Sequence, residues 1–353
     1  MKVLFLTPWY PSEQDAMSGL FVYKHAEAVR AQGVDVRVIH SQGWRDLRSE
    51  WRALQREGWI PDIVQLNVIQ KQGLLALWLK MRYGIPYIIV EHWSGYLNEN
   101  GQFLRLPKWQ RDLYRRIAAG AEIILPVSRV LTDAMHYYHI YNTRWGQIDN
   151  VVEECFFKKA DTTPKDANSS DFIEKKTLLH VSCFDERAKN VKGLLRAAKM
   201  LNEKRQDWRL VLIGTGTDYA EVRRFAKAIH LPEEQLVWTG ELAPHEVAEW
   251  MHRADAFVLS SRYETYGVVL AEAVAAGLPI LSTPVGIAED VADLIVPQEI
   301  AQNKPGTFAE FMESILWKQA AGNKKRKDAK RYTAQAVGKK LKSVYDSCMY
   351  RHL

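Results

Sequence analysis

Cysteine is scarce in this chain. Only three cysteines occur among the 353 residues, and they lie far apart, at Cys155, Cys183 and Cys348. No Cys-x-x-Cys pair and no cluster of cysteine with histidine is present, so the sequence indicates neither a disulfide framework nor a zinc site. We expect a protein without a metal and without a cofactor.

Long hydrophobic runs are also missing. The apolar segment Val3–Leu6 is stopped by Pro8, which leaves it too short for a signal peptide or a membrane span. No other stretch approaches the roughly 20 apolar residues that a spanning helix requires. We interpret Val3–Leu6 as a buried strand and expect a cytoplasmic protein.

Neither positive nor negative charge dominates the whole chain, but the net charge differs strongly between its segments. The net charge is +6 overall, and it is +4 in residues 1–160, −6 in 161–322 and +8 in 323–353. A basic first half and a basic tail fit an anionic substrate or membrane, and they equally fit solvated helix surfaces. We expect no nucleic-acid partner.

One basic helix in the first half carries aromatic residues. Pro107–Ala119 has Trp109 and Tyr114 on a strongly basic helix that Pro107 would begin. The helix is either a solvated surface element with both aromatics packed inward, or a patch that meets the acceptor or an anionic membrane. The basic residues concerned are Arg105, Lys108, Arg111, Arg115 and Arg116.

Glycine marks the ends of several expected helices. At four places a helix-like stretch ends at glycine and an apolar run follows within two residues, which predicts a left-handed glycine after each helix. Continuous apolar runs are typical of parallel strands buried on both faces. The alternation predicts an α/β protein with doubly wound parallel sheets. The four cases are Gly33 before Val34–Ile39, Gly84 before Pro86–Val90, Gly120 before Glu122–Leu125, and Gly277 before Pro279–Leu281.

The alternation is interrupted once, over the polar stretch Lys158–Lys176, which contains Pro164 and Asn168. This composition predicts a linker between two domains. Strands are expected to resume afterwards, and a last helix is expected from about Asp328 to Tyr350, with Val337, Leu341, Val344 and Tyr345 at helical spacing. We therefore expect domains at 1–160 and 161–327, followed by a helical segment at 328–353. The strands expected after the linker are Thr177–Ser182, Trp208–Ile213, Leu236–Thr239 and Ala256–Leu259.

The segment Ser260–Ala273 carries the clearest chemistry. It follows an expected strand and begins a helix, whose N-terminal N–H groups attract phosphate. Gly267 would let a diphosphate approach the backbone. Glu264 stands just before this helix and Glu272 about two turns along it, and carboxylates are strong acceptors for sugar hydroxyls.

The pair Glu264 and Glu272, followed by Ala273 and by Ala276–Pro279, resembles the signature of retaining glycosyltransferases of family 4 with the GT-B fold. The resemblance implies two Rossmann-like doubly wound domains facing across a cleft. It also implies that Glu264 contacts the transferred sugar and Glu272 the nucleotide ribose. The backbone amides of Tyr266, Gly267 and Val268 would then hold the distal phosphate.

Weaker resemblances extend over most of the chain. Ser18 and Gly19 match the family's acceptor-side glycine loop, and His92, within Glu91-His92-Trp93-Ser94, matches a histidine that approaches the donor sugar. The tail resembles a helix that crosses back onto the first domain. Three further residues are expected on the donor side: Gly240 and Leu242 near the base, and Gly214 in a turn that lines the cleft, which lacks the third glycine of a dinucleotide site.

One position departs from the family pattern. Where members commonly carry an arginine that binds the diphosphate together with a lysine six residues later, this chain has Cys183, although Lys189 is in register. Arg187 or Lys192 would have to compensate for the missing arginine.

The resemblance implies transfer of a sugar from a UDP- or GDP-sugar to a glycan or lipid-linked acceptor, with retention, in cell-envelope polysaccharide synthesis. Without an acidic metal motif, basic groups and helix N–H groups would neutralise the departing diphosphate. Peripheral contact with the inner face of an anionic membrane stays open. The alternatives are a nucleotide-sugar epimerase, a phosphorylase on a similar frame, or a non-catalytic subunit that binds a sugar nucleotide. The sequence does not identify the sugar, the base or the acceptor.

Overall fold

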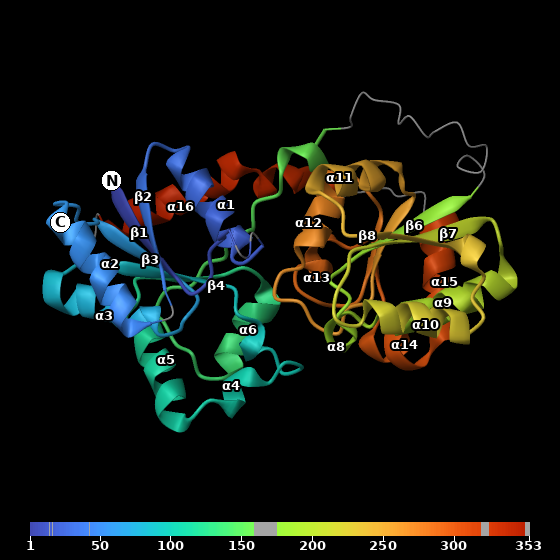
Figure 1. Cartoon of the computed structure of the whole chain (residues 1–353), viewed down its shortest axis with the longest axis horizontal. Coiled ribbons are helices and arrows are strands. Elements are labelled where there is room, and N and C mark those ends of the chain that lie inside the picture. Colours follow the sequence, from blue (N-terminus) through green and yellow to red (C-terminus); the bar gives the residue numbers. More distant parts are fainter. Residues whose placement is uncertain (14, 16, 42, 159–174, 319–324, 350–353) are drawn as a thin grey trace. The chain divides into compact units, whose positions relative to one another are not determined.

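A computed structural model describes residues 1–353 except 14, 16, 42, 159–174, 319–324 and 350–353. The chain forms two compact units, one combining Met1–Val151 with Arg331–Leu353 and the other comprising Val152–Lys330 (Figure 1). The first unit is thus built from two separate segments of chain. Apart from its ends, the stretch 158–176 that we expected as a linker lies outside the described residues.

The first unit contains a five-stranded parallel sheet in the order β2-β1-β3-β4-β5. The order changes direction at β1, because β2 lies on one side of it and β3 on the other. The strands are β1 (Lys2–Thr7), β2 (Asp35–His40), β3 (Ile63–Asn67), β4 (Tyr87–Glu91) and β5 (Ile124–Pro126). The helices are α1 (Leu20–Arg30), α2 (Trp44–Arg56), α3 (Gln72–Tyr83), α4 (Gln102–Arg105), α5 (Lys108–Gly120), α6 (Arg129–Tyr137) and the 3-10 turn η1 (Ser94–Tyr96).

The second segment of this unit is helix α16 (Ala334–Met349), drawn in red beside the blue α1 in Figure 1. The two helices pack closely, because a Cβ added at Gly338 would lie 2.1 Å from the carbonyl oxygen of Ala28. Two polar contacts fix the segment further: Arg331 donates two hydrogen bonds to the buried Asp149 carboxylate, at 3.0 and 2.8 Å, and the Tyr345 hydroxyl donates to Gln65.

The second unit contains a six-stranded parallel sheet in the order β11-β10-β9-β6-β7-β8. Its strands are β6 (Lys176–Val181), β7 (Trp208–Ile213), β8 (Leu236–Gly240), β9 (Ala256–Leu259), β10 (Ile280–Ser282) and β11 (Leu294–Ile295). Its helices are α8 (Glu186–Lys189), α9 (Val191–Lys204), α10 (Tyr219–Ala228), α11 (Pro244–Arg253), α12 (Val268–Ala275), α13 (Ala288–Val291), α14 (Gln298–Asn303) and α15 (Pro305–Glu313). The unit also contains the 3-10 turns η2 (Glu154–Phe156) and η3 (Glu233–Gln235) and the π-helical segment η4 (Ser314–Lys318). The 3-10 helix η5 (Lys325–Tyr332) continues from this unit into the second segment of the first unit.

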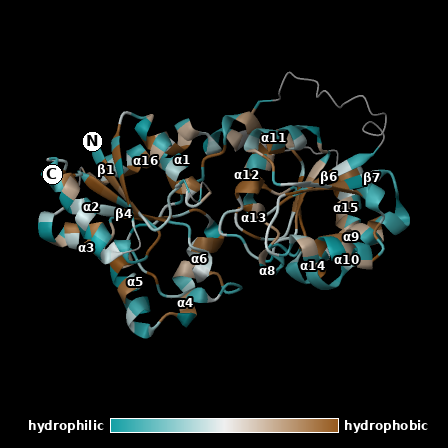
Figure 2. Ribbon diagram, viewed as in Figure 1, coloured by the Kyte–Doolittle hydropathy of each residue, from teal (hydrophilic) through white to brown (hydrophobic). Residues whose placement is uncertain are grey.

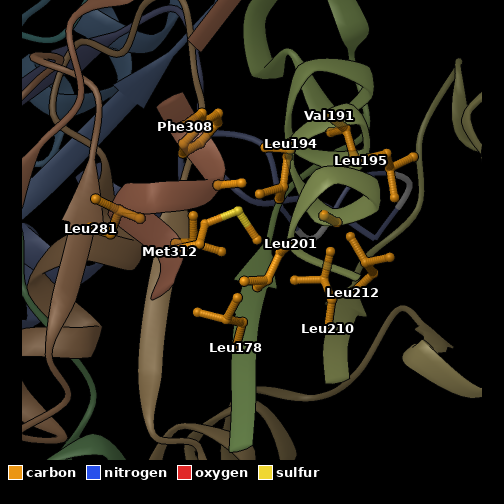
Figure 3. Packing of buried hydrophobic residues seen from close by; sticks show 14 of the residues in the cluster. Leu178, Val191, Leu194, Leu195, Leu201, Leu210, Leu212, Leu281, Phe308 and Met312 are labelled. Atoms are coloured by element: carbon orange, nitrogen blue, oxygen red, sulfur yellow. The ribbon is translucent and has the colours of Figure 1, made fainter. Parts of the chain in front are cut away.

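The core of the second unit shows why its strands need no polar alternation. In Figure 3, leucines of α9 meet Phe308 and Met312 of α15 above the buried side chains of β6 and β7. Figure 2 shows the strands of both sheets mostly in brown and the outward turns of the helices in teal. A parallel sheet covered by helices on both faces buries both of its faces, which explains the continuous apolar runs.

The expected α/β class with two Rossmann-like units is confirmed, and the expected strands agree with the observed ones to within about two residues at each end. The last helix differs from the expectation, because the structure ends a 3-10 segment at Tyr332 and begins α16 only at Ala334. Residues up to Met349 are helical, and Tyr350 lies outside the described residues.

Three of the four helix-ending glycines are left-handed, with φ of 76° at Gly33, 71° at Gly84 and 75° at Gly277. Gly120 is an exception, because it remains inside α5. A Cβ at Gly120 would lie 2.4 Å from the Tyr87 hydroxyl, which donates a hydrogen bond to the carbonyl of Ile117. Close packing, and not the reversal of the backbone, requires glycine there.

The basic helix α5 also differs from the simpler of its two interpretations. Tyr114 is buried, but Trp109 is 69% exposed, so only one of the two aromatic side chains packs inward. Pro107 precedes the first helical turn and does not belong to it.

Candidate functional site

In the second unit, the ends of the parallel strands bring together residues that lie far apart in the sequence. Ser182 and Cys183 follow β6, Gly214 follows β7, and Gly240 ends β8, with its carbonyl accepting a 2.7 Å hydrogen bond from the Gly214 amide. The next strand, β9, leads directly into the expected glutamate segment. The carboxyl edge of an open parallel sheet is the usual place for a ligand site.

The turn after β7 passes very close to the backbone that follows β6. A Cβ at Gly214 would lie 2.0 Å from the carbonyl oxygen of Ser182, and one at Gly216 would lie 1.7 Å from that of Cys183. Gly214 also has a φ of 117°, which disfavours other residues. Both positions therefore require glycine, because any side chain would collide with the backbone that follows β6.

An ion pair joins two of the expected donor residues. The Lys189 ammonium lies 2.5 Å from the Glu264 carboxylate, and the exposed fractions of the two side chains are only 16% and 14%. The same carboxylate oxygen accepts a 2.8 Å hydrogen bond from Ser261. Burial alone would lower the pKa of Lys189, but the charge of Glu264 and their hydrogen bond outweigh it, so the pKa is raised above its ordinary value.

A network of hydrogen bonds positions Lys189. Asn190, in the left-handed conformation with φ of 51°, ends α8, and the Ser260 hydroxyl donates to the Lys189 carbonyl at 2.9 Å. Arg262 donates to the Asn190 side chain at 2.9 Å and also to the carbonyl of Glu186. The sequence pattern had suggested no role for Arg262, although it stands two residues before Glu264.

Helix α12 begins at the last of the three expected phosphate-binding residues. Gly267, with a φ of 77°, precedes Val268, the first residue of this helix, and Tyr266 is buried beside it. A Cβ at Gly286 would lie 2.2 Å from the Tyr266 carbonyl oxygen, so the backbone at Gly286 packs tightly against the backbone at Tyr266. Glu272 lies half-buried on the same helix.

The other expected donor-side residues lie at the same edge of the sheet. Leu242 follows β8 and is half-buried, whereas Cys183 is exposed. Of the two residues that we expected to compensate for Cys183, Arg187 is exposed and Lys192 forms an ion pair with Glu221.

A buried histidine lies at the end of β6, close to this pair of charges. His180 contacts the Val258 carbonyl at 3.0 Å and the Ser182 hydroxyl at 2.9 Å. Burial lowers the pKa of His180 to about 4, and the positive charge of Lys189 contributes to this lowering. His180 is therefore neutral near pH 7.

In the first unit, the expected residues lie around the end of β4. His92 is buried, its ring lies 4.2 Å from that of Phe21, and its Nε2 has no partner in the described part of the chain. The backbone at Gly19 is left-handed and precedes α1, and a Cβ there would lie 2.2 Å from the carbonyl oxygen of Trp9. The Ser18 amide donates to Asp15, so the loop that we expected on the acceptor side is folded back on itself.

Two neighbours of His92 were not assigned a role from the sequence. Glu91 is fully buried and accepts hydrogen bonds from the backbone amides of Ile69, His92 and Trp93, yet burial raises its pKa to about 7. His25 contacts the Asp149 carbonyl at 3.0 Å, and burial lowers its pKa to about 4. Burial also lowers the pKa of His92, and His25 adds to the effect. Spacing could not reveal His25, because it lies inside an amphipathic helix.

No group of three or more His, Cys, Asp and Glu side chains is placed to hold a metal ion within the described ranges. Among those same residues, no helix has both the length and the apolar composition that crossing a bilayer requires.

Two family models match the chain. Residues 3–150 match the glycosyl transferase 4-like domain, and residues 163–336 match glycosyl transferases group 1. The two matches together span most of the chain, and each coincides closely with one of the two sheets.

Curated relatives and solved structures agree with these matches. The chain is 29% identical over 167 residues to N-acetyl-alpha-D-glucosaminyl L-malate synthase of Bacillus anthracis, covering 47% of this chain and 42% of that protein. It is 24% identical over 255 residues to alpha-monoglucosyldiacylglycerol synthase of Streptococcus pneumoniae, covering 68% and 56%. The matched segments thus span about half the length of these relatives.

Among solved structures, the fold is similar to that of HepE from Anabaena in complex with UDP-glucose, with a TM-score of 0.71, 14% identity, and coverage of 98% of this chain and 100% of that one. Both the family models and the arrangement of two parallel sheets lead to the same assignment: the chain belongs to the glycosyl transferases group 1 family and has the two Rossmann-like units of the GT-B fold.

Proposed function

We propose that the protein is a retaining glycosyltransferase of family 4 that transfers a sugar from a UDP- or GDP-sugar to a glycan or lipid-linked acceptor. The observation that carries this proposal is the Lys189–Glu264 ion pair beside the beginning of α12. A cation, a carboxylate and free helix N–H groups are what a sugar diphosphate needs at the bond that breaks. The complex of HepE with UDP-glucose supports a nucleotide-sugar donor.

In the proposed chemistry, Lys189 binds the phosphate and Glu264 binds the transferred sugar. The distal phosphate binds Lys189 and the amides at the start of α12, which stabilise the negative charge that develops as the bond from the sugar C1 to the phosphate oxygen breaks. Glu264 accepts a hydroxyl of the transferred sugar, and Glu272 accepts the ribose hydroxyls. The acceptor oxygen bonds to C1 on the face that the phosphate leaves, and its proton passes to the departing phosphate.

His92 is proposed as a hydrogen-bond partner of the donor sugar. Its buried Nε2 has no partner among the described residues, and its lowered pKa keeps the ring neutral. A neutral imidazole can accept or donate a hydrogen bond without attracting a counter-ion, which suits an uncharged sugar hydroxyl. Ser18 and Gly19 are proposed to line the acceptor side.

The remaining parts of the proposal concern the cellular setting. We propose a metal-independent enzyme, because Lys189 and the helix N–H groups supply the positive charge that a metal would otherwise supply. We also propose a role in cell-envelope polysaccharide synthesis at the cytoplasmic face of the membrane. The exposed Trp109 on the basic helix α5 supports a peripheral contact with anionic lipid.

A second candidate is a non-catalytic subunit that binds a sugar nucleotide. It is favoured by one observation, the exposed Cys183 in place of the family's arginine. Turnover of a UDP- or GDP-sugar by the purified protein separates the two candidates, because a binding subunit has none.

The decisive experiment compares two glutamates. Glu264→Gln removes a charge beside the transferred sugar and should lower kcat by about 100-fold or more, with little change in nucleotide affinity. Glu272→Ala should instead weaken nucleotide binding by roughly 1.5–3 kcal/mol, the contribution of one charged hydrogen bond. Glu310→Gln, on an exposed residue of α15, is the matched control. Kinetics like those of the parent in both site variants would reject the assignment.

A further inference from the structure

A concave site lies in the helix layer of the first unit, between α2 and α3. It is a cavity of about 430 Å³, within the size range of pockets that hold small ligands. Its lining includes the rings of Trp44, Trp51, Trp78 and Tyr83 and the guanidinium groups of Arg48 and Arg52. None of the residues assigned to the donor or to the acceptor loop takes part in it.

Packing between the two helices would be the simplest reason for such a stripe. On α2, the residues Trp44, Arg48, Trp51 and Gln55 follow one another at spacings of three or four, as helix-contact residues do. Packing would however fill the space between them. Instead Trp44 and Trp78 remain 42% and 38% exposed, and the cavity stays open.

The rings are held in place although the cavity is open. Trp78 meets Tyr83 edge to face, with 5.3 Å between ring centroids and an angle of 80°, and Trp51 lies 6.0 Å from the same ring. Gln55 donates a 3.1 Å hydrogen bond to the Tyr83 hydroxyl, and the Arg82 guanidinium lies 5.6 Å over that ring. A site that is already ordered loses little conformational entropy when a ligand binds.

Polar groups at the cavity are left unpaired. Trp51 is only 3% exposed, and its indole Nε1 has no hydrogen-bond partner in the described part of the chain. Likewise, no ion pair is formed by Arg48 or Arg52 with any carboxylate among the described residues.

We propose that this cavity binds an acidic oligosaccharide. The faces of aromatic rings carry partial negative charge and attract the polarised C–H groups of a pyranose ring. Unpaired guanidinium groups bind carboxylate or sulfate in a bidentate fashion. A concave pocket with fixed rings fits a discrete sugar better than a flat membrane surface. The site requires no donor and no catalysis, so it goes beyond the proposed function and can be tested apart from it.

Calorimetry on the whole protein tests the proposal with trigalacturonate as the acidic probe and maltotriose as its neutral counterpart. Trp78→Ala and Arg52→Gln alter exposed residues of the lining, so both variants should fold. Arg45→Gln removes the same charge from the same helix outside the lining and is the matched control. Inorganic phosphate and vesicles containing phosphatidylglycerol are the two further probes.

We expect trigalacturonate to bind at least about tenfold more tightly than maltotriose, as one charged hydrogen bond implies. Each lining variant should lose about tenfold or more in affinity, and Arg45→Gln should stay within about twofold of the parent. No binding of trigalacturonate, or equal loss in Arg45→Gln, would overturn the proposal. So would maltotriose or phosphate binding as tightly as trigalacturonate, or lining variants that lose only their binding to vesicles.

Discussion

Around the end of β4 in the first unit, buried polar side chains are held with little charge, whereas at the strand ends of the second unit a lysine and a glutamate form an ion pair. Burial keeps His25 and His92 neutral and raises the pKa of Glu91 to about 7. In the second unit, Lys189 stays protonated and Glu264 lies against it. Two sheets of the same construction thus present different chemistry at the same structural position.

The contrast follows from what surrounds each group. Glu91 accepts backbone hydrogen bonds, but no cation is paired with it in the described residues, so desolvation decides its pKa. Glu264 and Lys189 compensate each other, so both tolerate partial burial. A neutral polar site suits hydroxyl groups and a paired charge suits a phosphate that can replace one partner, which matches the roles we propose for the two units.

The largest expected effect comes from breaking the charged side of this comparison. Lys189→Met leaves the Glu264 carboxylate buried without its partner and should lower the free energy of unfolding by about 3–5 kcal/mol. It should also weaken binding of a nucleoside diphosphate strongly and of a nucleoside little. The double variant Lys189→Met/Glu264→Gln, which removes both charges, should recover most of the stability but not the binding. Chemical denaturation and calorimetry measure both; diphosphate affinity equal to that of the parent would place the phosphate site elsewhere.

The variant Glu91→Gln tests the uncharged polar residues around the end of β4 in the first unit. The pKa of Glu91 is raised from 4.5 to about 7, so its protonated form stabilises the fold below pH 4.5, and this stabilisation is lost as the pH rises through 7. The loss amounts to about 3 kcal/mol. The variant cannot ionise, so its stability relative to the parent should increase by about that amount between pH 5 and pH 9. Glu57→Gln, on an exposed residue, should show no such trend; a parallel pH dependence in parent and variant would contradict the assignment.

A smaller effect is expected for His180, the buried neutral histidine of the second unit. It tests whether that unit holds an uncharged group close to the Lys189–Glu264 ion pair. His180 titrates at about 4 when folded and near 6.5 when unfolded, so its contribution is present above pH 6.5 and is lost as the pH falls through 4. His180→Asn should therefore reduce the fall in stability between pH 6.5 and 5 by about 1.4 kcal/mol per pH unit. Urea unfolding of this variant and of the exposed His245→Gln as control measures the slope, and equal slopes would count against a buried neutral imidazole.

The smallest expected effect concerns the exposed position where an arginine was expected. Cys183→Arg should strengthen diphosphate binding by up to about fivefold at low salt, as an exposed charge pair worth about 0.2–1 kcal/mol implies. The gain should shrink in 0.5 M salt, because exposed charges are screened. Cys183→Gln adds bulk without charge and should leave affinity unchanged. Equal affinities for the arginine and glutamine variants would show that this position does not reach the phosphate.

Local patterns in the sequence predicted the framework well, for reasons visible in particular elements. The run Trp208–Ile213 is wholly buried in the structure, and a mainly apolar run of that length next to a helix pattern is typical of a strand covered on both faces. The strand Ile63–Asn67 was not named, because Gln65 and Asn67 interrupt its apolar run. Both side chains are nevertheless buried, and they hydrogen-bond to each other at 2.8 Å.

The candidate site was only partly accessible from the sequence. Glu264 and Lys189 were identified separately through a family resemblance, but their direct contact joins residues 75 positions apart and depends on tertiary structure. Burial, which sets the protonation of Glu91 and His25, depends on the same packing. Trp109 shows the reverse case, since one of the two interpretations of its helix placed inward a side chain that the structure leaves exposed.

The two-segment construction of the first unit affects how the protein is made. Residues 1–151 leave the ribosome first, yet their fold is completed by α16, whose Val337, Leu341 and Tyr345 are buried against it. The whole second unit is translated in between and, because it is one continuous segment, can fold while the first unit still waits for its last helix. When it does so, the two units are completed in the reverse of the order in which they are synthesised, and the apolar face of α1 stays uncovered during the delay.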